Sequence, residues 1–445
     1  MDYLIRFSQS HEDFRLPEIE ALADLEGIPM KVIFYELESP FCIVSLPSAD
    51  AARKLVHRSI LAFSIHELWG YAPSGEYPEL HASTRERASA EWPQYAQTPF
   101  KFEIDAYQHT RTMPERLGLI ESFRFLELKG PIDLRNPDVR FTIFEDWPFR
   151  PSGTPPSAHA TRLFMGRWLA NGSRDAARVY DLKKRSYIST TSMDSELALV
   201  TANIAQAAPG RLFYDPFVGT GSFPVAAAHF GALAFGSDID GRSIRGKGGK
   251  KSLRGNFAQY GLEALVGDFF TADLTNTPLQ VRRWLDGIVC DPPYGVREGL
   301  KVLGTREGDK REPPDLSGER TWKSGGYIPP KKPYSFLAML DDILQFATDM
   351  LVDNGRLSFW MPTANDNDQE IAVPTHPSLV IVSMCVQPFN KWSRRLITYR
   401  RLPDSEVDQE KLAAWKKRQR TGATADELNP FRESYFKGFR KDEAA

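Results

Sequence analysis

The segment DPFVGTGSF, from Asp215 to Phe223, has the residue types and spacing of a ligand-binding turn. Gly219 and Gly221 allow a ligand to approach the main chain without a Cβ in the way. A turn of this kind after a strand is where open α/β sheets bind nucleotides. Pro224 stands where a dinucleotide fingerprint has its third glycine, and the turn is not a GxxxxGK loop. These departures favour a nucleoside without a diphosphate over NAD or ATP.

Two further carboxylates follow predicted strands. Asp238 closes LAFGSDID and lies nineteen residues after Gly219, where a carboxylate can accept hydrogen bonds from both ribose hydroxyls. Asp268 closes LEALVGD, and we expect it to accept a hydrogen bond from an adenine amino group. Because neighbouring parallel strands end at one edge of a sheet, Asp215, Asp238 and Asp268 are predicted to converge there. Helix capping is the structural alternative for each residue taken singly.

The segment Asp291-Pro292-Pro293-Tyr294 follows the apolar strand WLDGIVC. An exocyclic amine is conjugated with its ring, so it has to be held and polarised before it can attack a methyl donor. The Asp291 carboxylate and a main-chain carbonyl of the Pro-Pro segment can accept its two hydrogens, and Tyr294 can stack on a base taken out of its helix. A proline turn with a core tyrosine is the structural alternative.

This last segment resembles the DPPY motif of amino-group methyltransferases. The resemblance implies S-adenosylmethionine as cofactor and an exocyclic amino nitrogen of a nucleic-acid base as acceptor. The cofactor carries an activated methyl group, so no catalytic triad or catalytic metal is needed. The chain's task is then to bind and position both reactants.

Short apolar strands alternate with helical stretches from residue 183 to residue 403, which predicts an α/β domain with a doubly wound, Rossmann-like sheet. Residues 1–150 show strand and helix patterns of an α+β region. We predict a linker at 151–182, because PFRPSGTPPSAHA is rich in proline. The last part, 404–445, is predicted to be a polar helix and tail, and 296–333 is predicted to be a long insertion.

Composition limits the class of protein. The 445 residues have a formal net charge of −2, which argues against a protein that coats nucleic acid by bulk electrostatics. Three separated cysteines suggest neither disulfides nor a metal site. With no secretory leader pattern and no apolar stretch of membrane-spanning length, we expect a cytoplasmic protein.

Basic residues gather in two segments near the predicted site. They are Arg245, Lys247, Lys250, Lys251 and Arg254 in the first, and Lys391, Arg394, Arg395, Arg400 and Arg401 in the second. We interpret both segments as candidate contacts to RNA phosphates. Solvated surface charge is the alternative interpretation.

Taken together, RSYISTTSM, DPFVGTGSF, GSDID, DPPYG and the N-terminal α+β region resemble the catalytic subunit of the eukaryotic tRNA (guanine-10-N2)-methyltransferase family. The resemblance covers nearly the whole chain, and DLRNPDVRFTIFED resembles the closing strand of a THUMP RNA-binding domain. It implies a ferredoxin-like and THUMP region that grips tRNA, and a heterodimer with a small zinc-binding activator protein.

The same resemblance implies a role for each matching position. Thr190 and Thr191 lie near the methionine part of the cofactor. Independently of the resemblance, the pattern before SELALVTANIA makes Ser192 a candidate N-cap of that helix. The remaining cofactor-binding positions are Asp215, Phe217, Gly219, Gly221, Asp238 and Asp268, and the base-binding positions are Asp291, Pro292, Pro293 and Tyr294.

Two other functions stay open at this point. The same chemistry could act on another RNA or on adenine in DNA, although the THUMP-like N-terminus favours tRNA. A non-catalytic RNA-binding scaffold is the second, and the presence of Asp238, Asp268 and the DPPY motif argues against it.

Overall fold

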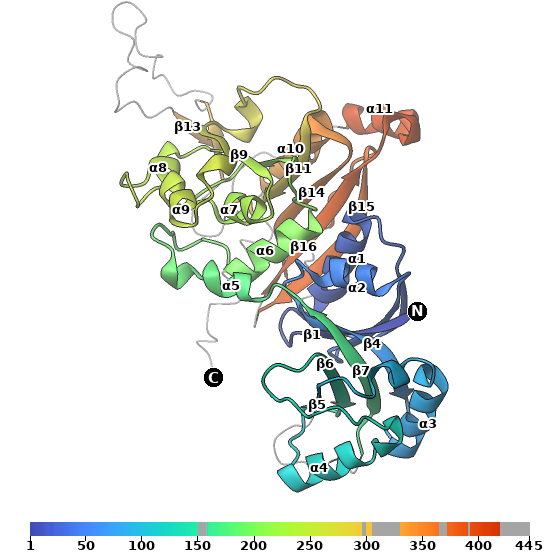
Figure 1. Cartoon of the computed structure of the whole chain (residues 1–445). Helices are drawn as coiled ribbons and strands as arrows, with labels where there is room; N and C mark the ends of the chain where they lie inside the picture. The colour runs from blue at the N-terminus through green and yellow to red at the C-terminus, as the bar shows by residue number, and fades with distance from the viewer. Residues whose placement is uncertain are drawn as a thin grey trace, which may run out of the picture. The chain divides into compact units, whose positions relative to one another are not determined.

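The computed structural model describes residues 1–149, 157, 159–295, 300–304, 330–364, 372–389 and 392–418. The chain divides into two compact units, Met1–Ala176 and Ala177–Ala445. Each unit contains a seven-stranded sheet (Figure 1). In the described part of the chain, no helix is long and apolar enough to cross a membrane.

The N-terminal unit begins as a ferredoxin-like fold. Its elements are β1 (Asp2–Phe7), α1 (Glu12–Leu25), β2 (Lys31–Tyr35), β3 (Phe41–Ser45), α2 (Ala49–Val56) and β4 (Ala62–Ala72). The strands pair antiparallel in the order β2-β3-β1-β4. Helix α1 is tied to the start of β4 by the buried carboxylate of Glu18, which accepts hydrogen bonds from the main-chain N–H groups of Ile60 and Leu61. The predicted α+β region is confirmed.

The second half of the N-terminal unit adds three strands to the same sheet, together with two helices. Its elements are α3 (Tyr77–Ala88), β5 (Phe100–Tyr107), α4 (Met113–Glu121), β6 (Val139–Asp146) and β7 (Arg162–Asn171). Strands β4, β7, β6 and β5 follow one another in the sheet, and only β5 and β6 are parallel. Helix α4 begins with a capping box in which Thr112 and Glu115 satisfy each other's main-chain N–H groups.

The predicted linker at 151–182 is wrong in part, because it contains strand β7. Residues 162–171 are not a connection, because they pair with both β4 and β6 inside the N-terminal sheet. Leu163, Phe164 and Met165 are fully buried there. The proline-rich composition that suggested a linker is confined to the residues before Thr161, so the N-terminal unit extends well past residue 150.

The C-terminal unit has the predicted doubly wound sheet. Its strands are β8 (Leu212–Asp215), β9 (Leu233–Asp238), β10 (Val266–Thr271), β11 (Leu285–Cys290), β14 (Leu351–Ala364), β15 (Leu379–Pro388) and β16 (Trp392–Arg401). Their order is β10-β9-β8-β11-β14-β16-β15. The first five are parallel, and β16 runs antiparallel to both β14 and β15. From β8 the chain adds β9 and β10 on one side of the sheet and then returns to add β11 and β14 on the other. The point between β8 and β11 is the switch point at which such sheets bind ligands.

Helices connect and cover these strands. They are α5 (Asp175–Val179), α6 (Ser195–Ile204), α7 (Ser222–His229), α8 (Gly241–Arg245), α9 (Leu253–Gln259), α10 (Phe336–Met350) and α11 (Gln409–Lys417). The apolar face of α10 packs on the sheet through Leu340, Ile343 and Leu344. Helix α11 confirms the predicted polar helix, while the residues after 418 lie outside the described residues.

The predicted insertion at 296–333 is described only at its base. Strands β12 (Lys301–Leu303) and β13 (Lys331–Pro333) pair antiparallel there. Residues 305–329, which contain most of the charged sequence, lie outside the described residues. The base of the insertion therefore adds a small two-stranded sheet after β11.

Arg401, at the end of β16, is a structural residue rather than an RNA contact. Its side chain is fully buried, pairs with Asp353, lies 2.9 Å from the Asp404 carboxylate and donates to the Thr348 carbonyl. The neighbouring Arg400 has a partly exposed side chain that donates to the amide oxygen of Asn354 at 2.6 Å.

Replacing Arg401 by alanine is expected to destabilise the C-terminal unit by about 2 kcal/mol. Removing one partner of a buried ion pair costs about 3–5 kcal/mol, and the value is discounted here because both acidic partners are half-exposed. Chemical denaturation would measure the loss, with Arg400→Ala as the control that shows little change. Equal stability of the two variants would refute the structural role of Arg401.

Candidate active site

The turn after β8 is built by one carboxylate and two glycines. The Asp215 side chain is buried and accepts a hydrogen bond from the Phe217 N–H at 2.9 Å. Gly219 has φ +48° and Gly221 has φ +87°, a region that favours glycine. A Cβ added at Gly219 would have only the Phe217 carbonyl oxygen nearby, at 3.9 Å. The main chain at Gly219 is therefore open on this side, whereas a Cβ at Gly221 would meet the Leu253 side chain at 3.1 Å, so the open approach predicted for both glycines holds only for Gly219.

Asp238 joins this turn to the end of β9. One carboxylate oxygen accepts from the Gly219 N–H at 2.9 Å, and the other accepts from the Asp240 N–H at 2.8 Å. Burial raises the pKa of Asp238, and these two main-chain donors oppose that rise. Each oxygen has a second lone pair, so the carboxylate retains acceptor capacity for a ribose hydroxyl.

Asp268 does not lie at the end of a strand, and this part of the prediction is wrong. Strand β10 continues through Thr271, which pairs with Asp238, whereas Asp268 pairs with Phe235 further back. The Asp268 side chain is 61% exposed and forms an ion pair with Arg254 at 2.7 Å. The physical reason is that GDFFT continues the apolar strand pattern for three residues past the aspartate.

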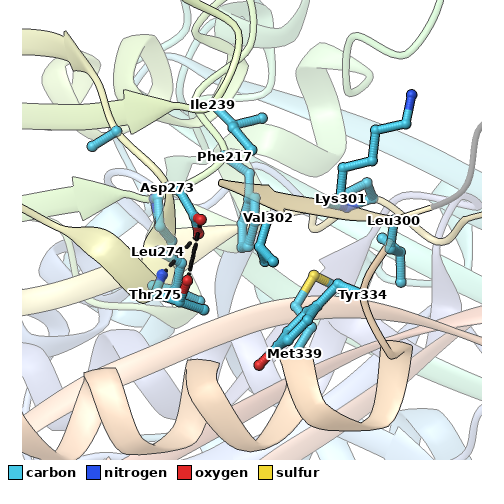
Figure 2. A pocket seen from close by; sticks show the side chains of 13 residues that line it. Phe217, Ile239, Asp273, Leu274, Thr275, Leu300, Lys301, Val302, Tyr334 and Met339 are labelled. Carbon is cyan, nitrogen blue, oxygen red and sulfur yellow. Dashed lines mark hydrogen bonds between the residues drawn. The ribbon is translucent and has the colours of Figure 1, made fainter. Parts of the chain in front are cut away.

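Asp273, rather than Asp268, is the aspartate that lies just beyond the end of this strand. It follows β10 and lines a mostly apolar cavity together with Phe217, Ile239 and Pro293, as Figure 2 shows for the labelled residues. Its buried carboxylate accepts hydrogen bonds from the N–H groups of Thr275 and Leu303, each at 2.8 Å.

The far wall of this cavity was missed by sequence reasoning. It comes from the base of the insertion and from α10, through Leu300, Lys301, Val302, Tyr334 and Met339 (Figure 2). No local motif marks these residues. The available signal was the apolar character of the residues that flank the charged insertion.

The segment before α6 is attached to the glycine turn. The Ser192 hydroxyl lies 2.8 Å from that of Thr220 and accepts from the Ser189 N–H. Thr190 and Thr191 between them are exposed. The N-cap of α6 is Asp194, whose carboxylate accepts from the first-turn N–H groups of Glu196 and Leu197, so the capping role expected of Ser192 is wrong.

Asn256 is a second residue that sequence reasoning missed. It is fully buried on α9, and its amide donates to the carbonyls of Tyr187 and Thr220 at 2.8 and 3.0 Å. Its oxygen accepts from the Tyr187 N–H. This one side chain holds the segment before α6 against the glycine turn.

The Asp291 carboxylate lies where β11 ends. Its side chain is 22% exposed, its Oδ1 accepts from the Tyr294 hydroxyl, and its Oδ2 lies 3.9 Å from Nη1 of Arg394. Burial raises the pKa of Asp291 to about 6, against the lowering effects of Arg394 and the Tyr294 hydrogen bond. Pro292 is buried behind it, and Pro293 is exposed.

Aromatic rings gather beside the DPPY segment. Phe389 and Trp392 stack with centroids 4.6 Å apart, and the Trp392 ring meets the Tyr294 ring edge-on at 6.5 Å. Phe389 is 38% exposed. The pair comes from the ends of β15 and β16, which reach the same edge of the sheet as Asp291.

The two basic segments differ in the structure. Arg245, Lys247, Lys250, Lys251 and Arg254 are all exposed around the connection from α8 to α9. In the second segment, Arg395 is buried and donates to the Thr363 hydroxyl at 2.6 Å, so the predicted phosphate contact does not fit it. Arg394 faces Asp291, and Lys391 lies outside the described residues.

Comparison with known proteins identifies the family. The model of the Tmrp11 THUMP N-terminal domain matches residues 1–174, and that of the RMKL-like methyltransferase domain matches residues 183–302. The tRNA (guanine(10)-N(2))-methyltransferase of Saccharomyces cerevisiae is 43% identical over 408 residues, covering 89% of this chain and 92% of the relative. The chain belongs to the tRNA (guanine(10)-N(2))-methyltransferase family.

Other members of the family match over a similar length. The Schizosaccharomyces pombe enzyme of the same name is 38% identical over 437 residues, covering 90% of each chain. The human enzyme, tRNA (guanine(10)-N(2))-methyltransferase TRMT11, is 34% identical over 464 residues, covering 99% of this chain and 96% of the relative. The resemblance drawn from the motifs is confirmed, and so is the THUMP assignment.

Asp238 and Asp268 give a matched test of the cofactor pocket. Asp238→Asn is expected to weaken S-adenosylmethionine binding about 10- to 100-fold, because it removes charge-assisted hydrogen bonds worth about 1.5–3 kcal/mol each. Asp268→Asn weakens an exposed ion pair with Arg254, keeps a side-chain oxygen that can accept from the Phe269 N–H, and is expected to leave binding within about 2-fold. Isothermal titration calorimetry would measure both, and a larger loss at Asp268 would restore the sequence-based assignment.

Proposed function

We propose that the chain transfers the methyl group of S-adenosylmethionine to the exocyclic N2 of guanosine 10 in tRNA. The observation that carries the proposal is the partly buried Asp291 carboxylate of a DPPY segment, which follows β11 at the same sheet edge as the glycine turn and Asp238. Membership of the family supports tRNA as the substrate, and the residues of the site support methyl transfer to an amino nitrogen.

The residues at this edge fit S-adenosylmethionine. The open main chain at Gly219 can lie against the ligand, and Asp238 can hold ribose hydroxyls. Phe217 and Ile239 offer apolar contacts to an adenine ring at the same cavity. Thr190 and Thr191, next to the turn, stay candidates for the methionine part. When bound, the cofactor supplies a methyl group already activated on a sulfonium.

Asp291 and the Pro-Pro segment would orient the acceptor. The carboxylate can accept a hydrogen bond from one N–H of the guanine amine, and a main-chain carbonyl can accept a hydrogen bond from the other. The nitrogen lone pair is then directed out of conjugation. The same carboxylate can take the proton that the nitrogen loses. The Tyr294 hydroxyl donates to Oδ1 of Asp291, so Oδ2 has the greater remaining acceptor capacity for the base.

The aromatic residues would hold the base itself. A guanine taken out of its helix needs a flat apolar surface on which to stack. Tyr294, Phe389 and Trp392 offer such surfaces within one cluster beside Asp291. The THUMP region would bind tRNA elsewhere on the molecule, as the family resemblance implies, and a cytoplasmic location stays a prediction.

Asp291→Ala is expected to lower the single-turnover methylation rate about 1000-fold, because it removes the acceptor that polarises the amine in the transition state. Unmodified tRNA, labelled cofactor and mass spectrometry of the nucleosides would measure this. The assay is run with the chain alone and with its proposed small zinc-binding activator, which we expect to raise the rate. A tRNA with guanosine 10 replaced is the substrate control, and N2-methylguanosine formed equally well by the variant would refute the role of Asp291.

The exposed basic residues around α8 and α9 are proposed to contact tRNA phosphates. Lys247→Glu combined with Lys250→Glu is expected to weaken tRNA binding at least about 10-fold and to reduce its salt dependence, since phosphate contacts release counterions. Filter binding across a salt series would measure both effects. Unchanged affinity would assign these lysines to a solvated surface, and unchanged cofactor affinity is the control for folding.

A further inference from the structure

Arg394 lies at the active edge of the sheet, although its sequence neighbours suggested a surface role. It is the third residue of β16 and pairs with Pro362 of β14. Its side chain is 16% exposed, and its Nη1 atom lies 3.9 Å from Oδ2 of Asp291. The Tyr294 hydroxyl donates to the other oxygen, Oδ1.

Three neighbours hold the Arg394 guanidinium in place. Its Nε donates to the side-chain oxygen of Gln387 on β15 at 2.6 Å. Its charged carbon lies 4.8 Å from the centroid of the Trp360 ring and 5.6 Å from that of Phe389. Trp360 is fully buried and donates to the Thr201 hydroxyl. An arginine held by a hydrogen bond and a buried indole is oriented before any substrate binds.

The charged surroundings of Asp291 explain why a cation is needed there. Tyr294 donates to it from its own segment, and Asp215 and Cys290 are buried groups whose pKa values its charge raises further. Burial also disfavours the ionised form of Asp291 itself. Among the described residues, Arg394 is the only cation recorded in an ion pair with Asp291.

We propose that Arg394 is a positioning residue for methyl transfer, which keeps the Asp291 carboxylate ionised and oriented to accept hydrogens from the base amine. This inference rests on the proposed function, because it concerns the same carboxylate. A protonated Asp291 would carry a donor on one oxygen, and that oxygen could neither accept an amine hydrogen nor take up the proton released from N2.

The proposal predicts a pH profile. Wild-type methyl transfer should fall as the pH drops through about 6, the pKa of Asp291, because the carboxylate becomes protonated. An opposite charge at this distance lowers a carboxyl pKa by about 1–3 units, so its removal should move the acidic limb upward by at least about 1 pH unit. The variant should then lose about 5-fold in rate at pH 6 and recover to within about 2-fold of wild type at pH 9.

Single-turnover rates at saturating tRNA and cofactor, from pH 5.5 to 9, test this with Arg394→Gln and Arg394→Met. The methionine variant keeps apolar packing on Trp360, so one of the two can serve if the other does not fold. Arg394→Lys retains the charge and should return the midpoint toward the wild-type value. Lys411→Gln, an exposed side chain on α11 that pairs with Asp408 at 3.1 Å, is the control and should leave the profile unchanged.

Three results would overturn the proposal. An unshifted midpoint with the same loss of rate at every pH would show a general structural role. A weaker tRNA affinity with an unchanged rate constant and profile would show a phosphate contact. A folded variant that stays inactive at pH 9 would show that charge on Asp291 is not what Arg394 controls. Wild-type chain that forms no N2-methylguanosine, even with its proposed activator present, would instead refute the proposed function.

Discussion

The hydrogen bond from the Gly219 N–H to the Asp238 carboxylate is the constraint on which the site depends. It joins the turn after β8 to the end of β9 over 2.9 Å, and it requires a backbone that glycine adopts readily. The same carboxylate caps the residues that follow β9 through the Asp240 N–H. A single side chain therefore fixes the relation between two loops that must hold one ligand.

The second constraint is the low polarity around Asp291. Moving a carboxylate away from water strengthens every hydrogen bond that it accepts, but it also favours the neutral acid. Two groups beside Asp291 favour its ionised form: the Tyr294 hydroxyl donates to it, and the Arg394 cation lies close to it. Tyr294 follows the end of β11, whereas Arg394 lies near the start of β16. The two meet because β16 runs antiparallel to β14 and begins at the edge where β11 ends. A reversed final strand thus brings an arginine and two aromatic rings to a site otherwise built from parallel strands.

The two units divide the chemical tasks. The methyltransferase sheet contains the glycine turn, the carboxylates and the DPPY segment, whereas the THUMP match covers the N-terminal unit alone. The N-terminal sheet is completed by β7, which lies late in that unit and pairs with strands on both sides. Strand β7 therefore joins the ferredoxin-like strands to β6 and β5.

What the sequence by itself determined is local. The glycine turn, Asp238 and the DPPY segment were identified because each combines a turn with a functional group over a few residues, and because their order follows the strands of a doubly wound sheet. The family could be recognised for the same reason. The alternation of strands and helices also predicted the α/β class of the C-terminal unit.

Strand length, pairing and burial were decided only by the tertiary structure. Three more residues of β10 placed Asp268 inside the strand and left Asp273 as the aspartate that follows its end. Pairing with two neighbours turned residues 162–171 from a predicted linker into a strand. Adjacent arginines on β16 acquired different roles, with Arg395 directed to Thr363 and Arg394 to Asp291. Successive side chains on a strand point to opposite faces of a sheet, and which face becomes a site depends on residues that are distant in the sequence.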